Sequence, residues 1–299
     1  MILITGATGY IGRHLVSRLV NRGDRPCCLV RDIDRASHTL PADKVELVQG
    51  DTTKPDSLGA AVQSVDTIVH AAFLTADHKE TPSNRYEETN VTGTQNLVSV
   101  AQHAGVKRII EISGLGTKPD KPSSYMQGRY LAEQIVIESG LDWTIIRPSV
   151  LFGKGAPFIK GLAELIQTAP VLPLIGGGKT MFQPIYVEDV ISVIVAVLDD
   201  PAKTRGEIYT IGGPQYYSFT QIFDLLLQAM HKKRLKVYAP RSLVGIGVTA
   251  MEAVLPKPPL TQAAMSLFSF DNTTDLDSVE RDFGFIPLPF TQYLQEHGV

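Results

Sequence analysis

The hydrophobic positions in the first half of the chain alternate between short apolar runs and longer periodic stretches. Runs of apolar, largely β-branched residues predict six strands, at residues 2–4, 26–30, 45–48, 67–69, 108–112 and 143–146. Between them, apolar positions recur at helical spacing and predict helices at about 11–20, 86–104 and 125–139. Apolar strands that alternate with helices are typical of a buried parallel sheet. The pattern therefore predicts the α/β class, with a doubly wound parallel sheet.

The pattern changes after the sixth predicted strand. Proline and glycine become more frequent and the alternation becomes irregular, although helical periodicity persists near residues 187–198 and 219–230. We therefore expect two domains, an N-terminal domain at 1–152 and a smaller C-terminal α/β lobe at 153–299. Residues near 183–198 are expected to return to the first domain.

One apolar segment, residues 243–255, is a candidate for several roles. Thr249 and Glu252 interrupt it, and it is shorter than the roughly 18 residues of a membrane-spanning helix. We expect it to pack into the core of the C-terminal lobe. Two alternatives stay open: the segment could form an exposed apolar cover over a substrate cleft, or it could dock on a protein partner or make peripheral contact with a membrane surface.

Composition narrows the classes of ligand. The net charge of −3 leaves no excess of basic groups to neutralise a phosphate backbone, so nucleic acid is not expected as a partner. Cys27 and Cys28 are adjacent in a predicted strand and point to opposite faces, and His70 has no ligand at suitable spacing beside it. We expect neither a disulfide nor a metal site. The chain enters its first strand without a signal or transit segment, which favours a cytoplasmic protein.

Three glycines follow the first predicted strand and open the first predicted helix. Gly6 would permit a tight turn, Gly9 would let the backbone approach a pyrophosphate, and Gly12 would let helix and strand pack closely. The helix N-terminus would offer unpaired N–H groups to the phosphates. The residues between the glycines join the expected contacts: Thr8, Tyr10 and Ile11. We therefore predict a Rossmann domain that binds a dinucleotide.

The end of the second predicted strand bears on the choice of dinucleotide. Asp32 could accept hydrogen bonds from a ribose diol and favour NAD(H), whereas Arg31, with Arg35 nearby, could pair with a 2′-phosphate and favour NADP(H). We predict NADP(H), with NAD(H) as the weaker alternative. Asp51 and Thr52, after the third strand, are candidates for the adenine edge, although Asp51 could instead cap the next helix.

Several segments together resemble the extended and atypical short-chain dehydrogenase/reductases, which are similar to the NAD-dependent epimerases and dehydratases: residues 5–12, 50–51, 70–72, 90–94 and 147–153. Further segments are most similar to the atypical branch that includes the NADPH-binding accessory subunit of respiratory complex I and its bacterial relatives: residues 112–116, 140–148, 176–179 and 182–187. The resemblance implies strand order 3-2-1-4-5-6-7 and a C-terminal lobe over the nicotinamide end. It also implies cofactor contacts from Ala71, Ala72, Asn90 and Pro148, while Asn90 could instead bond a neighbouring backbone group.

The same resemblance implies a catalytic set of a serine, a tyrosine and a lysine four residues after the tyrosine. Here Tyr125 and Arg129 have that spacing and share a helix face, so both can act on one site, but arginine does not replace a compact ammonium conservatively. Ser113 ends the fifth strand, whereas the family's hydroxyl usually stands two residues later, where this chain has Leu115. Thr117 could substitute only if the loop bends. The candidate catalytic residues are Tyr125, Arg129 and Ser113, two of them at altered positions.

Two functions therefore compete. The altered catalytic positions favour an NADP(H)-binding protein with a role in binding, assembly or sensing and with weak or absent turnover. The alternative is an active NADPH-dependent oxidoreductase or epimerase that uses Tyr125 on a small carbonyl, sugar-nucleotide or quinone-like substrate. In either case the C-terminal lobe would receive a small-molecule substrate or a protein partner.

Overall fold

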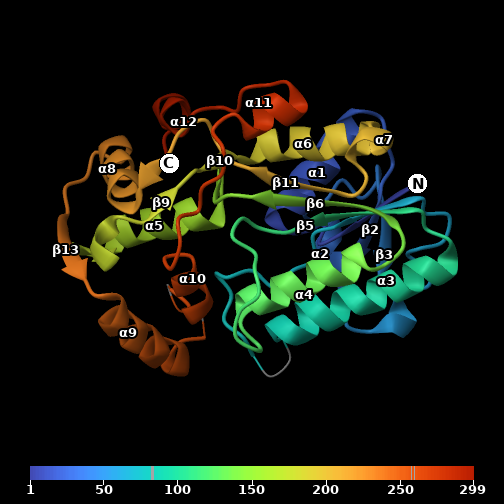
Figure 1. Cartoon of the computed structure of the whole chain (residues 1–299), viewed down its shortest axis with the longest axis horizontal. Helices are drawn as coiled ribbons and strands as arrows, with labels where there is room; N and C mark the ends of the chain where they lie inside the picture. The colour runs from blue at the N-terminus through green and yellow to red at the C-terminus, as the bar shows by residue number, and fades with distance from the viewer. Residues whose placement is uncertain (82–83, 257, 259) are drawn as a thin grey trace. The chain divides into compact units, whose positions relative to one another are not determined.

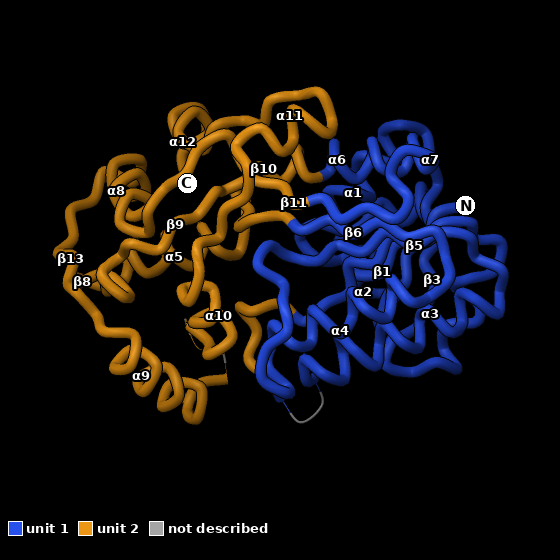
Figure 2. Tube along the Cα trace, in the orientation of Figure 1, with its two compact units in different colours: residues 1–74, 80–147, 191–209 blue, residues 75–79, 148–190, 210–299 orange. Residues whose placement is uncertain are grey.

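The chain divides into two units that are described separately. The computed structural model describes residues 1–81, 84–256, 258 and 260–299. Unit 1 comprises residues 1–74, 80–147 and 191–209, and unit 2 comprises residues 75–79, 148–190 and 210–299 (Figure 2). Both units therefore draw on segments that are distant in the sequence.

A seven-stranded sheet forms the centre of unit 1 (Figure 1). Its strands lie in the order β3 (Glu46–Gln49), β2 (Cys27–Val30), β1 (Ile2–Thr5), β4 (Thr67–His70), β5 (Arg108–Ile112), β6 (Asp142–Pro148) and β11 (Glu207–Ile211). The pairs β1–β2, β1–β4, β2–β3, β4–β5 and β5–β6 are all parallel. The predicted α/β class and the strand order 3-2-1-4-5-6-7 are confirmed, with β11 as the seventh strand.

Helices cover both faces of this sheet, because its central strands are apolar on both sides. On one face lie α3 (Gly93–Ala104) and α4 (Tyr125–Ile137), and on the other lie α1 (Tyr10–Asn21) and α6 (Val187–Asp199) (Figure 1). Buried apolar residues of α3 and α4 pack against β1, β4, β5 and β6: Leu97, Val98, Ala101 and Val136 against Leu3, Ile68, Ile109 and Ile145. Shorter helices complete the unit: α2 (Ile33–Ser37), the 3₁₀ turn η1 (Pro55–Ser57) and α7 (Pro201–Thr204).

The predicted helix at 86–104 is present but does not begin as an α-helix. Its first part, η2 (Glu87–Thr92), is a π-helix, and α3 continues from it to Gly105, a left-handed C-cap. A π turn contains one more residue than the α turn that apolar periodicity reports, so the pattern could not distinguish the two. The predicted helix at 125–139 starts at Tyr125, where Ser124 caps it, and ends two residues early at Ile137.

Unit 2 combines small two-stranded ladders with helices. The ladders are β7 (Leu151–Phe152) with β10 (Ile185–Tyr186), β9 (Met181–Phe182) with β12 (Tyr217–Ser218), and β8 (Val171–Ile175) with β13 (Leu235–Ala239). The other elements are α5 (Pro157–Thr168), η3 (Gly176–Gly178), α8 (Phe219–Ala229), α9 (Arg241–Val254), α10 (Gln262–Ser266), α11 (Ser278–Phe283) and α12 (Phe290–His297). Aromatic residues dominate its core, among them Phe152, Phe182, Phe219, Phe223 and Phe290.

The expectation that residues 243–255 pack into the core is wrong for one side of the segment. Val248 is fully buried, but Leu243, Ile246 and Val254 are 64%, 69% and 80% exposed. Because apolar residues occur on more than one side of α9, the sequence could not show which of these sides would be covered. Within the described residues, no helix has the length and apolarity needed to cross a bilayer.

Candidate functional site

The glycine turn between β1 and α1 is held by its own backbone. Gly6 has a φ of +69°, and the N–H of Gly9 donates to its carbonyl oxygen at 2.8 Å. A Cβ on Gly6 would lie 2.4 Å from the carbonyl oxygen of Ala71, and a Cβ on Gly12 would lie 2.1 Å from the carbonyl oxygen of Gly6. Both glycines are therefore required by the packing of the turn itself.

The start of α1 has the features of a phosphate cradle. Gly9 is the N-cap, no side chain caps the helix, and its first turn contains no acidic residue. Its first N–H groups are thus left for an anion, which the helix dipole also favours. Thr8 is exposed and Tyr10 and Ile11 are partly exposed beside this turn. These features fit a dinucleotide pyrophosphate.

The two residues that bear on the choice of dinucleotide differ in what they already bind. Asp32 is the N-cap of α2, and its carboxylate accepts from the backbone N–H of Arg35 at 3.0 Å. Arg31 is exposed, and its side chain forms no hydrogen bond or ion pair with any described residue. Arg31 is therefore available to an anionic group, while part of the capacity of Asp32 is used locally.

The residues after β3 are held by local hydrogen bonds. The carboxylate of Asp51 accepts from the N–H of Thr53 at 3.0 Å and from its hydroxyl at 2.9 Å. Thr52 is buried, and its carbonyl oxygen accepts from the side chain of Asn96 at 2.9 Å. Asp51 therefore stabilises its own turn, a role close to the capping alternative.

A buried histidine closes the end of β4. The Nδ1 of His70 lies 2.7 Å from the hydroxyl of Thr5, and its Nε2 lies 3.0 Å from the hydroxyl of Thr94. Burial lowers the pKa of His70 to about 3, so its ring is neutral at pH 7. Ala71 and Ala72 follow, and Ala71 faces Gly6 through its carbonyl group. His70 thus supports the backbone beside the glycine turn, and no described cluster of His, Cys, Asp or Glu has a metal-binding arrangement.

Asn90 fastens the loop that follows these alanines. From the π-helix η2, its side chain accepts from the N–H of Leu74 at 2.7 Å and donates to the carbonyl oxygen of Leu74 at 3.1 Å. Asn90 is fully buried, so these two bonds satisfy backbone groups that water does not reach. The neighbouring Phe73 lies between two site residues, with its ring centre 4.7 Å from that of His70 and 5.6 Å from the guanidinium carbon of Arg129. The contact of Asn90 with neighbouring backbone matches the alternative offered by its sequence.

Tyr125 and Arg129 lie on one face of α4, as their spacing requires. The Nε of Arg129 donates to the hydroxyl oxygen of Tyr125 at 2.6 Å, and its Nη1 donates to the hydroxyl of Ser113 at 3.4 Å. Arg129 is 6% exposed, and it lies against Gly114, where a Cβ would come within 2.9 Å of Nη1. The guanidinium therefore joins the tyrosine to the serine inside the unit.

Ser113 belongs to a larger buried network. Its hydroxyl donates to Glu133, a fully buried carboxylate on α4, which also accepts two hydrogen bonds from Arg147 on β6. The turn after β5 bends at Gly116, whose φ is +82°, and this brings the Thr117 hydroxyl to 3.3 Å from that of Ser113. The loop thus has the bend that Thr117 needed to approach the site.

Another buried carboxyl group, that of Glu111, lies near the network of Ser113, Arg129 and Glu133. Glu111 stands on β5 and is fully buried, and neither carboxylate oxygen has a hydrogen-bond partner among the described residues. Burial, and then the nearby charge of Glu133, raise the pKa of Glu111 well above its usual value, against the opposing effect of Arg129 and Arg147. Burial therefore disfavours the charged form of this second carboxyl group, which lies near the ion pair of Glu133 and Arg147.

The sequence reasoning missed Glu111, Glu133 and Arg147. Two signals could have indicated them. Glu111 is a charged residue inside an apolar strand, and Glu133 follows Arg129 by four residues, which puts it on the same helix face. Pro148, an expected cofactor contact, is buried and ends β6 next to Arg147.

Comparison with known proteins gives matches along most of the chain. A family model described as NAD(P)H-binding matches residues 6–201. Over 278 residues, 91% of the chain and 68% of the relative, the chain is 27% identical to NADH dehydrogenase [ubiquinone] 1 alpha subcomplex subunit 9, mitochondrial, of Arabidopsis thaliana. Over 223 residues, 74% of the chain and 68% of the relative, it is 31% identical to ceramide reductase of Caulobacter vibrioides.

A solved structure agrees with the fold. Triphenylmethane reductase of Citrobacter sp., complexed with NADP(H), superposes with a TM-score of 0.77 over all of both chains, at 18% identity. At this identity the match bears on the fold alone. Together with the family model, this structure confirms the predicted Rossmann fold of the α/β class.

Proposed function

Because the chain belongs to the NAD(P)H-binding family of atypical short-chain dehydrogenase/reductases, we propose that it holds NADP(H) in a binding, assembly or sensing role, with weak or no turnover. The observation that carries this proposal is the arrangement of Arg129. Its guanidinium is buried and already bonded to Tyr125 and Ser113. Arg129 stands at the position of the family's lysine, but its donors bond to Tyr125 and Ser113 of the protein itself.

The backbone of the glycine turn would hold the pyrophosphate. Gly9 and the first N–H groups of α1 supply donors, Gly6 and Gly12 keep the turn closed, and Arg31 would pair with a 2′-phosphate. When bound, this cofactor supplies or accepts a hydride. The remaining expected contacts stay predictions: Thr8, Tyr10, Ile11, Asp51, Thr52, Ala71, Ala72, Asn90 and Pro148.

Selectivity for NADP(H) is tested with Arg31→Ala. We expect NADPH affinity to fall about tenfold or more, as for the loss of a charge-assisted phosphate contact, while NADH affinity changes little. Arg205→Ala is the matched control, since Arg205 is also exposed and lies 3.9 Å from its nearest carboxylate, that of Asp142. An unchanged NADPH:NADH affinity ratio in Arg31→Ala would rule out this role.

Slow or absent turnover is tested by anaerobic single-turnover mixing. NADPH-loaded protein is mixed with a panel of carbonyl and quinone compounds, and NADPH absorbance is followed. We expect little oxidation by the wild type and a faster reaction by Arg129→Lys, in which the compact ammonium is restored. Fast oxidation by the wild type that Tyr125→Phe abolishes would overturn the proposal.

That outcome would instead support the second candidate, an active reductase or epimerase. A cation bonded to the Tyr125 hydroxyl favours this candidate, because Tyr125 could exchange a proton at that oxygen. The two relatives' names point in both directions, one to a subunit of a larger complex and the other to a reductase. Capture of protein partners with and without NADPH tests the assembly or sensing role directly.

A further inference from the structure

Helix α9 of unit 2 has an apolar side that no described residue covers. Leu243, Ile246, Ala250 and Val254 follow one another at spacings of three and four, so they lie along one face of the helix. All four are exposed, and Val254 reaches 80%. The outward face of a helix in a globular protein is normally polar. The exposed face of α9 is therefore unusual and calls for a ligand or a partner.

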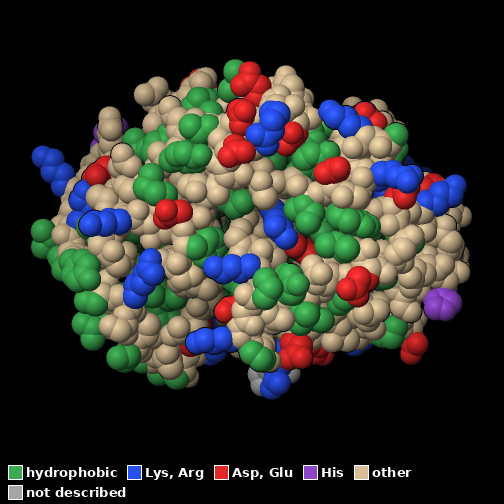
Figure 3. Space-filling view, viewed as in Figure 1, with side chains coloured by type: hydrophobic (Ala, Val, Ile, Leu, Met, Phe, Trp, Pro, Cys, Tyr) green, Lys and Arg blue, Asp and Glu red, His purple; other side chains and the backbone are tan. Residues whose placement is uncertain are grey.

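The neighbouring strand β13 extends this apolar surface. Leu235 and Tyr238 are each 64% exposed and Val237 is 43% exposed, since β13 is an edge strand that pairs with β8 alone among the described strands. Figure 3 shows hydrophobic side chains gathered over β13 and α9 at the left of the view. We call the exposed apolar residues of α9 and β13 together the α9–β13 surface.

The charges around the α9–β13 surface are mostly positive, although Asp224 pairs with Lys236 and Glu252 lies in the last turn of α9. Residues 225–251 contain no Asp or Glu but include five basic residues, Lys232, Lys233, Arg234, Lys236 and Arg241, in a chain whose net charge is −3. A long segment that is basic and apolar, in an otherwise slightly acidic protein, is typical of segments that meet an anionic surface.

Of these cations, Arg234 and Lys236 bond to protein groups, whereas Lys232 and Lys233 point to solvent. Arg234 donates to the carbonyl oxygens of Ile166 and Gln167 at the end of α5, and Lys236 is paired with Asp224. Lys232 and Lys233 form no side-chain hydrogen bond or ion pair with the described residues.

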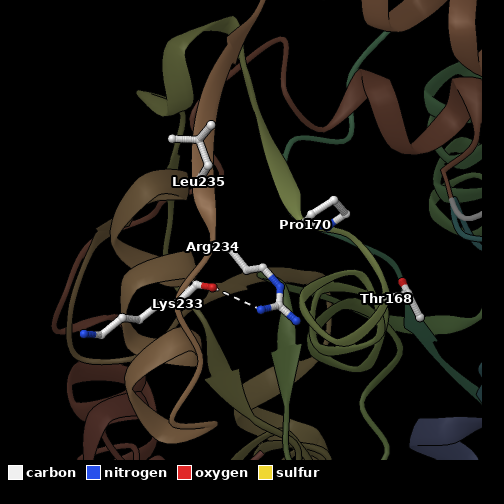
Figure 4. A pocket seen from close by; sticks show the side chains of 5 residues that line it. All are labelled: Thr168, Pro170, Lys233, Arg234 and Leu235. Atoms are coloured by element: carbon white, nitrogen blue, oxygen red, sulfur yellow. Dashed lines mark hydrogen bonds between the residues drawn. The ribbon is translucent and has the colours of Figure 1, made fainter.

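Arg234 and Lys233 line the same surface groove, but their side chains point in different directions. This groove has a volume of about 630 Å³, and Thr168, Pro170 and Leu235 also line it. Arg234 turns toward the groove, whereas the Lys233 amine points away from it (Figure 4). Arg241 donates to the hydroxyl of Thr180 at 3.3 Å, so the two lysines are the cations left for an outside ligand.

We propose that the α9–β13 surface binds an anionic lipid bilayer. Leu243, Ile246 and Val254 enter the boundary between headgroups and acyl chains, and Lys232 and Lys233 pair with lipid phosphates. An apolar surface that carries two solvent-facing lysines fits this interface better than it fits a protein, because the apolar face offers few hydrogen-bonding groups for specific recognition.

The test uses the full chain and vesicles of stated composition. We expect co-sedimentation with vesicles of phosphatidylcholine mixed with phosphatidylglycerol, no co-sedimentation with phosphatidylcholine alone, and weaker binding as salt increases. Ile246→Asp should lower the partition about tenfold or more. The matched control is Ile286→Asp, in the same unit at 67% exposure, compared with 69% for Ile246, and it should bind like the wild type.

The lysines and a second apolar position complete the test. Lys232→Glu and Lys233→Glu should each weaken binding about fivefold or more, in line with the attraction of one cation to an anionic leaflet. Val254→Asp, at the most exposed position, provides a second variant if Ile246→Asp does not fold, and retained thermal unfolding and NADPH binding verify that each variant is folded.

Three outcomes would overturn the proposal. One is the absence of binding to anionic vesicles, and another is an equal loss in Ile286→Asp and Ile246→Asp. The third is a dimer in solution that Ile246→Asp dissociates, because a second copy of the chain would then cover the surface. None of these outcomes bears on NADP(H) binding, so the two proposals fail separately.

Discussion

The glycine turn and the Tyr125–Arg129 network lie in the same unit but are built in opposite ways. The turn consists of backbone groups from residues close in sequence, and the absence of side chains makes its close contacts possible. The network consists of side chains from β5, α4 and β6, with two buried carboxyl groups and two arginines. A backbone site tolerates few residue types, whereas a side-chain network can be rebuilt with other residues.

This difference explains why binding and turnover need not occur together. The turn retains every feature that anion binding requires. In the network, Arg129 packs against Gly114, and its donors are directed to Tyr125 and Ser113. A chain can therefore keep the first site while the second takes on a structural role.

The largest effect is expected from Gly12→Ala. The added Cβ would lie 2.1 Å from a carbonyl oxygen in the same turn, so backbone must move. We expect NADPH affinity to fall about 100-fold and the free energy of unfolding to fall by about 3 kcal/mol. Isothermal titration and denaturant unfolding measure the two effects.

The matched control for Gly12→Ala is Gly161→Ala. Gly161 is also helical, and a Cβ there meets nothing within 4 Å. This change should stabilise the protein by up to about 1 kcal/mol, because alanine loses less conformational freedom than glycine on folding. If both substitutions had the same sign, close packing would not be the reason for Gly12.

A smaller loss of stability is expected from Glu133→Gln. Removing the buried charge leaves Arg147 without its partner and places an amide against hydrogen-bond donors, so we expect a loss of about 3 kcal/mol in chemical denaturation. NADPH affinity should change less than threefold or so, since the turn is built separately. Glu164→Gln, whose pair with Lys160 is exposed, should change stability by less than about 0.5 kcal/mol. A large loss of NADPH affinity in Glu133→Gln would show that the two sites are coupled.

Asn90 connects the two regions, because from η2 its side chain bonds the backbone of Leu74, in the loop that follows His70 and Phe73. We therefore expect Asn90→Ala to lower stability. Both backbone groups of the buried Leu74 would lose their partner, which costs about 2 kcal/mol. Asn96→Ala, which removes one partly exposed hydrogen bond to Thr52, should cost about half as much. Equal losses in thermal unfolding would contradict the importance given to the buried pair.

A change in pH dependence, rather than in stability at a single pH, is expected from Glu111→Gln. The pKa of Glu111 is raised in the folded chain, so the stability it contributes is complete below its ordinary pKa of 4.5 and is lost as pH rises toward the folded value. The groups facing it are Glu133, Arg129 and Arg147. The loss is at most about 1.4 kcal/mol per pH unit. Unfolding from pH 5 to 8 should therefore decline less steeply in Glu111→Gln, and an identical slope would disprove a raised pKa.

The sequence predicted the strands and the turn because apolar runs and glycine spacing are local patterns. Apolar runs located strands β1 to β6 to within two residues at each end, and the Gly6–Gly12 spacing indicated the turn. The π-helix at Glu87–Thr92 and the one-sided exposure of α9 were not predicted. Apolar periodicity reports neither an extra residue per turn nor which of several apolar faces is covered.

Sequence alone therefore determined the parallel sheet, the glycine turn and the shared face of Tyr125 and Arg129, because each follows from spacing along the chain. Tertiary structure alone decided that Arg129 turns to Ser113 and that Glu133 pairs with Arg147, while Glu111 remains without a hydrogen-bond partner among the described residues. These contacts join strands and a helix separated by 14 to 20 residues. Their geometry depends on how the sheet places β5 beside β6, and no local pattern contains that information.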